Sequence, residues 1–354
     1  MRRSSKFRAL RGGNPDGGAG RRGRGGRAVL GAPNRELCLL CRREGRPNVG
    51  RMSADGINFI EIPLAAPGRA PGQIPAGTLR CFRPQSLADT VEAIWDWDIP
   101  DDRAARALTI KQVPGTALLL MAHYRTPALS HHQGRSLPIK CATQIHKSAV
   151  SVQPIGPLGM IVVCLRADAA ARIVHAPPGQ FADANVYLGD VFGAGNVSVC
   201  DGLLASARSS GERLSVVESF LLRRLRPSSE TTAERVAALL KRTPGLQVQK
   251  LASDMGISAR HLSRSFKATF GIGVKQFARL ARIENIVAGR SKGLPWVEVA
   301  CDCGMVDQAH LIKEFKEIVG QSPTRFFEQA ICIEPGIIRT ANFIVQGSEH
   351  GTTT

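Results

Sequence analysis

The sequence predicts an α+β protein of several domains, in which a β-sandwich or β-barrel precedes an all-α domain. Its 354 residues are enough for two domains with separate cores. Short apolar runs separated by Pro/Gly turns fill residues 76–210, and two similar helix-turn-helix patterns fill residues 231–330. A hydrophobic content of 43% suits a globular protein. No apolar run approaches the ~20 residues of a membrane span, so no membrane partner is expected.

Residues 1–75 are predicted to form a disordered basic tail. They contain Arg/Gly-rich stretches and few periodic apolar positions, a composition that cannot bury enough surface to offset ordering entropy. Residues 1–50 hold 13 Lys and Arg against 3 Asp and Glu, so more than half of the formal charge of +18 lies in this tail. Such a tail either adds phosphate affinity without sequence information or has no role in binding. Met52 offers an internal start that would remove most of it.

The cysteines and histidines give no pattern typical of a metal or catalytic site. Nine cysteines form no regular framework, which indicates free thiols in a reducing cytoplasm. Cys38 and Cys41 have the spacing of half a zinc site, but no second pair follows. His131 and His132 lack the His-x-His spacing that puts two rings on one face of a strand, and the remaining histidines of this region are interpreted as surface or turn residues. We expect no metal, no cofactor and no catalytic residue, and the chain is not predicted to be an enzyme.

Residues 76–210 alternate short apolar runs with turns. A helix is predicted over residues 84–94, and strands over residues 95–99, 117–121, 139–145, 149–153 and 160–165. Helices are predicted at residues 168–174 and 195–209. Many short strands with turn residues between them indicate a small β-sandwich or barrel.

Residues 211–230 are predicted to form a helix and a linker. The helix carries a broad apolar stripe that includes Leu214, Val217 and Leu221. This stripe either pairs with a second copy of the chain or packs on its own domain. Thr231 or Thr232 is expected to cap the next helix. The last residues, 331–354, are predicted to be a flexible C-terminal tail.

The first helix-turn-helix pattern covers residues 248–267. Apolar residues there form one face of a short helix, and Gly256 can adopt the positive φ that ends it. Ser258 is a good N-cap for a second helix, in which Leu262 and Phe266 lie four residues apart and point back at the first. The opposite face of the second helix is polar and basic.

The second pattern covers residues 297–316. When the two copies are aligned on their turn glycine, Leu311 and Phe315 match the two apolar residues of the first copy, with one extra residue in the turn after Gly304. Asp307 takes the place of the serine N-cap. Two units of one design are therefore expected, joined by one helical segment.

These motifs resemble those of the AraC/XylS family of transcription regulators. The resemblance covers residues 231–330 and rests on residues 262–267, Gly271, Arg282 in the connecting helix, residues 300–308 and residues 315–323. Gly289 departs from the family pattern and predicts an early end of that helix. A looser resemblance to the family's cupin-like N-terminal domain rests on residues 166–170 and 188–193.

The resemblance implies a sequence-specific DNA-binding transcription factor with an N-terminal effector-binding or dimerisation domain. Its implied partners are double-stranded DNA, RNA polymerase, and either a small-molecule effector or a second copy of the chain. A helix-turn-helix presents its second helix to the major groove. Position by position, the implied DNA contacts are Arg260, Ser263, Arg264 and Lys267 in the first unit and Ala309, His310 and Lys313 in the second.

The second unit is expected to discriminate bases weakly. Arginine can donate two hydrogen bonds to guanine, whereas Lys313 donates singly and Ala309 offers only methyl contact. Glu314 follows directly after the lysine. Two other classes of protein stay open. An Ada-like DNA-repair enzyme would need a four-cysteine zinc site, and a non-specific nucleic-acid binder would depend on the Arg/Gly tail.

Overall fold

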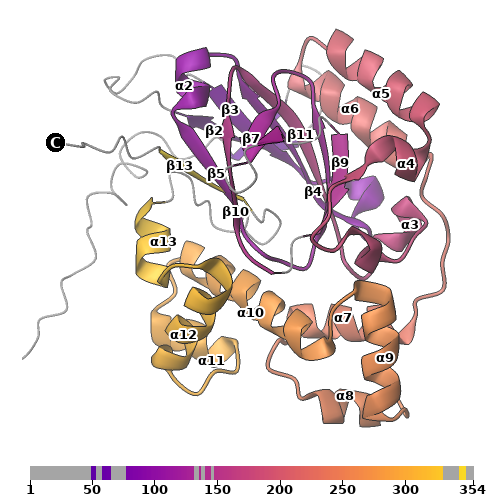
Figure 1. The fold of residues 1–354 in the computed structure, drawn as a ribbon, viewed down its shortest axis with the longest axis vertical. Coiled ribbons are helices and arrows are strands. Elements are labelled where there is room, and N and C mark those ends of the chain that lie inside the picture. Colours follow the sequence, from indigo (N-terminus) through magenta and orange to yellow (C-terminus); the bar gives the residue numbers. More distant parts are fainter. Residues whose placement is uncertain are drawn as a thin grey trace, which may run out of the picture.

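The computed structural model describes residues 49–52, 58–64, 77–130, 135–136, 140–144, 147–329 and 343–347. The tail through residue 48, with Cys38 and Cys41, lies outside these ranges, as do His131, His132 and His146. A β domain is followed by an all-helical domain, and the two lie against each other (Figure 1). The predicted α+β order is confirmed, and the β domain is consistent with a cupin-like sandwich.

Two antiparallel sheets form the β domain. The larger has the order β1 (Val49–Met52), β2 (Asn58–Leu64), β3 (Gly77–Phe82), β4 (Val91–Ile99), β11 (Leu158–Leu165), β6 (Leu118–His123), β9 (Lys140–Thr143) and β12 (Val186–Tyr187). The smaller has the order β13 (Phe343–Gly347), β5 (Leu108–Gln112), β10 (Val150–Pro154), β7 (Ala128–Ser130) and β8 (Arg135–Ser136).

The central strand β11 is buried along its whole length because both faces of the larger sheet are covered. Met160, Val162 and Cys164 join the core between the two sheets. Ile161 and Val163 join a second core on the outer face, under helices. Burial on both faces explains why this strand is a continuous apolar run instead of an alternating one.

Helices α3 (Ala171–Val174), α4 (Leu188–Phe192), α5 (Ala194–Ser206) and α6 (Ser210–Leu222) cover the outer face of the larger sheet (Figure 1). Leu214, Val217 and Leu221 of α6 lie in this outer core. Of the two alternatives for the apolar stripe, the structure thus shows packing on the chain's own domain. The Arg213 guanidinium also ties α6 to β4, because it donates to the buried Asp96 carboxylate at 2.9 Å.

Both predicted tails contain strands. The expectation of disorder over residues 1–75 is wrong for β1 and β2, and β2 pairs with β3 through Ile60 opposite Cys81 and Ile62 opposite Leu79. The expectation of a flexible tail over residues 331–354 is wrong for β13, where Val345 lies opposite Ile110. The physical reason is local: both segments hold runs of aromatic and β-branched residues, which favour strands, and each extends an available sheet edge.

The helix predicted at residues 84–94 is also wrong. A single 3-10 turn, η1 (Gln85–Leu87), precedes β4, which begins at Val91. The Leu87, Val91 and Ile94 side chains share the outer core, but they reach it from a turn and a strand. A bulge opposite Leu165 shifts the register next to Val91, so a helical spacing of apolar residues arises without a helix.

The C-terminal domain contains α7 (Thr232–Arg242), α8 (Val248–Asp254), α9 (Ala259–Phe270), α10 (Val274–Ser291), α11 (Trp296–Asp302), α12 (Gln308–Val319) and α13 (Pro323–Gln329). Thr231 caps α7 in a capping box with Glu234, as the sequence predicts. Helix α10 supplies Phe277 to the core of the first unit and Ile286 to the core of the second. The two units are therefore built on one shared helix.

Helix α10 does not end at Gly289 but runs to Ser291. A Cβ at Gly289 would lie 3.0 Å from a methyl carbon of Val299, so the glycine allows α11 to approach closely. Gly293, with φ of 83°, follows the helix end instead. Among the described residues, none of the helices combines the length and hydrophobicity needed to cross a bilayer.

His123 corrects the expectation of surface or turn histidines, because it is buried on β6. The His175 ring Nε2 lies 2.9 Å from the Arg224 carbonyl oxygen, at the end of α3. Cys81 and Cys141 are free thiols in the core, and burial raises the pKa of each to about 12. Such thiols behave as small apolar side chains.

Candidate DNA-binding interface

The first helix-turn-helix unit consists of α8, a tight turn and α9. Gly256 adopts a φ of 66° after α8, and the Ile257 N–H donates to the Ala252 carbonyl at 3.0 Å. The Ser258 hydroxyl accepts from the His261 N–H at 3.1 Å, which caps α9. The predicted turn glycine and N-cap are both confirmed.

The second unit repeats this geometry. Gly304 also has a φ of 66°, and the Met305 N–H donates to the Ala300 carbonyl at 2.9 Å. The Asp307 carboxylate accepts from the His310 N–H at 2.7 Å and caps α12. The extra residue of this turn is Val306, whose exposed fraction is 90%.

Helix α9 has a sharply divided surface. Leu262, Phe266 and Phe270 are buried in the core of the first unit. The predicted contact residues on the other side are all exposed, and the structure brings them together along one face: Arg260, Ser263, Arg264 and Lys267. Within the described part of the chain, the two arginine side chains have no ion-pair partner. Their guanidinium groups are therefore available to an external acceptor.

Helix α12 presents a different face. Leu311 and Phe315 are buried, while the predicted residues Ala309 and Lys313 are exposed beside each other. His310 is turned to the flank, where its Nε2 lies 3.6 Å from the Glu314 carboxylate. Ile312, which the sequence analysis does not single out, is 39% exposed. The repeat in the sequence could have identified Ile312, since Ile312 occupies in the second unit the position that Ser263 has in the first.

Glu314 does not face outward with Lys313. Its carboxylate is buried and accepts from the Arg282 side chain of α10, with Nε at 2.9 Å and Nη2 at 2.8 Å. Arg282 also donates to the Pro244 carbonyl oxygen at 3.3 Å, in the loop after α7. Arg282 of α10 thus holds both α12 and the loop that leads to the first unit against α10.

The helical domain also contacts the β domain through polar groups that sequence analysis missed. Glu284 of α10 is buried and accepts from the Thr116 N–H at 2.6 Å and from the Thr116 hydroxyl at 2.9 Å. Lys241 of α7 lies 3.5 Å from Glu284 and also pairs with Glu92 of β4. Nothing in the local sequence around these residues marks them, because the partners are far apart in the chain.

The interdomain cluster, defined as Glu92, Thr116, Lys241 and Glu284, contains two carboxylates and only one basic side chain. Burial raises the pKa of Glu92, with Glu284 adding to that effect and Lys241 opposing it. Burial disfavours the charged form of Lys241, but the two carboxylates outweigh it and the pKa of the lysine is raised. The lysine therefore stays charged between two acidic groups.

A second contact between the domains involves two glycines. The turn η2 (Pro178–Phe181) packs on the end of α9, where Gly271 has a φ of 72°. A Cβ on Gly179 would lie 2.7 Å from the Phe270 carbonyl carbon, closer than such atoms approach. Because Gly179 has no side chain, the β domain can contact the end of α9.

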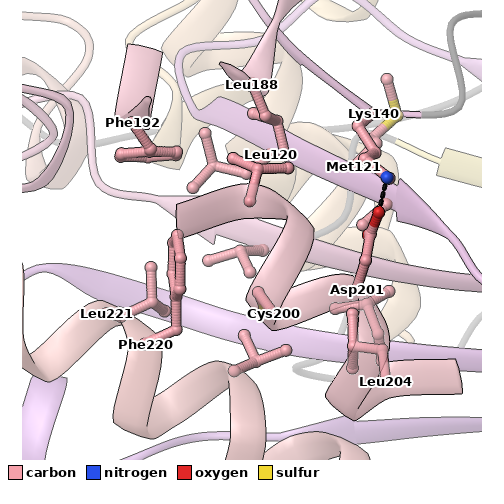
Figure 2. Close-up of a pocket in the computed structure, with 15 residues that line it drawn as sticks. Leu120, Met121, Lys140, Leu188, Phe192, Cys200, Asp201, Leu204, Phe220 and Leu221 are labelled. Atoms are coloured by element: carbon pink, nitrogen blue, oxygen red, sulfur yellow. Dashed lines mark ion pairs between the residues drawn. The ribbon is translucent and has the colours of Figure 1, made fainter. Parts of the chain in front are cut away.

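The β domain contains an apolar pocket between the outer face of its larger sheet and helices α4–α6 (Figure 2). Its volume is about 50 Å³, and its walls include Leu120, Phe192 and Leu204. Lys140 and Asp201 form an ion pair at one side, which keeps both charges occupied (Figure 2). Such a space fits a small apolar group.

The comparison with protein families agrees with the motifs. Residues 251–329 match the model of a helix-turn-helix domain family. No curated protein matches the chain. Among solved structures, ToxT from Vibrio cholerae has a TM-score of 0.40 and 10% identity, and the match covers 66% of this chain and 96% of that one. A DNA-binding transcriptional dual regulator from Escherichia coli K-12 has a TM-score of 0.27 and 18% identity, covering 29% and 95%.

The assignment depends on the C-terminal domain. It contains two turns of one geometry, two capped helices and a connecting helix held by Arg282, within the matched residues 251–329. The chain therefore carries an AraC-type helix-turn-helix domain at residues 251–329.

Proposed function

We propose that this protein recognises a specific DNA sequence by placing α9 and α12 in two successive major grooves. The supporting observation is that both helices are capped second helices of equivalent units at the two ends of α10. Helix α10 has 18 residues and hence a length of about 27 Å. This is compatible with grooves that repeat every ~34 Å on one face of B-DNA.

The donors for base recognition are concentrated in the first unit. Arg260 and Arg264 are exposed on α9 and carry guanidinium groups that match guanine O6 and N7. Lys267, one turn further on, is placed for a phosphate. Ser263 lies between the arginines and can donate to a base or a phosphate. On α12, Lys313 is the counterpart of Arg264.

The test is a footprint with wild type and with the Arg260→Ala/Arg264→Ala double variant. The variant should lose protection of one major groove, because each bidentate contact is worth about 1–3 kcal/mol of base discrimination. Arg103→Ala is the matched control, since Arg103 is an exposed arginine on α2 (Asp102–Arg106) of the β domain. Equal protection by wild type and the double variant would show that these arginines do not contact bases.

The β domain, in this proposal, regulates DNA binding by fixing how the helical domain is held. The support is that residues of the β domain contact the helices of the DNA-binding domain. Thr116 contacts α10, Glu92 contacts α7, and Gly179 contacts the end of α9. A change in the β domain that altered these contacts would move the first recognition helix directly. Variants of the interdomain cluster should therefore change operator affinity without touching DNA.

The effector, in this proposal, is a small apolar molecule that enters the pocket of Figure 2. The support is the chemistry of the walls, which are almost entirely aliphatic and aromatic. Xenon under pressure can serve as a probe in thermal unfolding of wild type and of Val197→Phe, which fills the pocket. Stabilisation of wild type alone is expected. Equal responses of the two proteins would place the effector elsewhere.

A further inference from the structure

The two recognition helices differ in chemistry at two equivalent positions. With Leu262 matched to Leu311, Ser263 corresponds to Ile312, and Arg260 corresponds to Ala309. At these two positions, hydrogen-bond donors of the first unit are replaced by apolar side chains in the second, while Lys313 and Lys316 keep the positive charge of Arg264 and Lys267. Ile312 is 39% exposed on a helix whose counterpart carries a hydroxyl at this position.

Acidic groups of α12 are held away from this apolar face. Glu314 pairs with Arg282, and Glu317 accepts from the Arg279 side chain at 2.6 Å, so both carboxylates are directed toward α10. His310 lies on the flank beside Glu314. The outer face of α12 is left with Ala309, Ile312, Lys313 and Lys316, which follow an i, i+3, i+4, i+7 spacing.

The base edges of the major groove offer one apolar group, the C5 methyl of thymine. An aliphatic side chain on a helix in this groove can bury that methyl, whereas every other base edge would leave a polar atom against it. Val306 is a further exposed aliphatic residue, in the turn just before α12. The lysines that flank Ile312 can hold the helix to phosphates while the aliphatic groups discriminate.

We propose that the second helix-turn-helix unit recognises thymine through its methyl group, with Ile312 as the principal contact and Ala309 beside it. This inference rests on the proposed function, because it requires α12 to enter a major groove. It replaces the expectation that the second unit discriminates weakly: that unit discriminates by apolar contact, and the first by hydrogen bonds. The operator is then a guanine-containing half followed by a thymine-containing half.

Deoxyuridine provides the test, since it keeps the pairing edge of thymidine and removes only the methyl group. The footprint assigns the halves: protection lost in Arg260→Ala/Arg264→Ala marks the α9 half, and the remaining protection marks the α12 half. Full-length protein is then titrated with duplexes carrying deoxyuridine in one half at a time. Affinity should fall about fourfold for each contacted thymine in the α12 half, the loss that corresponds to ~0.8 kcal/mol for one buried methyl group.

Ile312→Ala should bind the thymidine duplex more weakly than wild type does, and should lose most of the difference between the thymidine and deoxyuridine duplexes, because only Ala309 remains beside the methyl group. Ser263→Ala, the matched change in the first unit, should keep the full difference. Both residues are exposed, so neither change removes a core contact. Specific protection with no effect of deoxyuridine in the α12 half would overturn the inference and would mark Ile312 as a protein-docking residue. Absence of any specific protection would instead overturn the proposed function.

Discussion

The backbone N–H of Thr116 donates a 2.6 Å hydrogen bond to the carboxylate of Glu284, although 168 positions separate the two residues. Thr116 belongs to the loop before β6, and Glu284 lies in the middle of the helix that joins the two DNA-binding units. The β domain therefore reaches the helical domain at the helix that enters the cores of both units. Four predictions follow from this contact and from the helix geometry.

Lys241→Met should destabilise the protein by at most about 3–5 kcal/mol, the cost of removing one partner from a fully buried ion pair, because this lysine is only partly buried. The change leaves the Glu92 and Glu284 carboxylates facing each other without the lysine. Urea unfolding measures the loss. Lys250→Met is the control, because Lys250 is exposed on α8, and it should change stability by less than about 0.5 kcal/mol. Equal effects of the two changes would mean that the lysine contributes nothing specific.

Glu92→Gln should change how stability depends on pH. Burial raises the pKa of Glu92, so the folded chain binds this proton more tightly than the unfolded chain does. The corresponding stability is fully present below the ordinary glutamate pKa of about 4.3 and is lost as the pH rises through the folded value. Glutamine does not titrate.

The free energy of unfolding of Glu92→Gln minus that of wild type should accordingly grow from acid toward neutral pH. Urea unfolding of both proteins at a series of pH values gives this difference, in which titrating groups that do not interact with Glu92 cancel. A difference that shrank with rising pH would show that charged Glu92 is favoured in the folded state, against the sign given by its burial.

Ser258→Ala and Asp307→Ala should each cost about 1 kcal/mol, since each removes the N-cap of a recognition helix. Footprints should show a selective effect, with the first change weakening the α9 half of the site and the second weakening the α12 half. Ser253→Ala, at an exposed position on α8, is the control. If both cap variants weakened the two halves alike, the caps would act on overall stability and not on individual helices.

Gly179→Ala should push η2 away from the end of α9, because the added Cβ would lie 2.7 Å from the Phe270 carbonyl carbon. The domains should separate more readily, which limited proteolysis of the exposed linker at residues 227–231 would detect as faster cleavage. Gly195→Ala serves as the control, since a Cβ there meets nothing within 4 Å. Unchanged cleavage of the Gly179 variant would show that the glycine contact does not hold the domains together.

The sequence was sufficient for the helical domain because its signals are local and repeated. Gly256 and Gly304 mark the turns, and Ser258 and Asp307 mark the helix starts, each within a few residues of the structure it specifies. The stripe that includes Leu214 showed a helix but left its partner open, because an apolar face does not say what covers it.

The remaining features depend on distant partners. Strands β2 and β13 form because neighbouring strands offer open edges, which composition averaged over a tail does not reveal. The pairing of Glu284 with Thr116 rests on single polar residues in separate domains. Glu314 directly follows the exposed Lys313, yet it is buried against Arg282, because one position along a helix rotates a side chain by about 100°.

Helix α10 enters the cores of both units, so neither unit can slide or rotate without the other. This has a consequence for the spacing of the operator. Each base pair inserted between the two halves would rotate the second half about 35° around the duplex and carry it farther along the axis. Two units joined by a flexible linker could follow that movement, whereas units that share one helix would have to disrupt the packing of at least one core. The affinity of the protein for its operator should therefore depend as strictly on the spacing between the two halves as on their sequence.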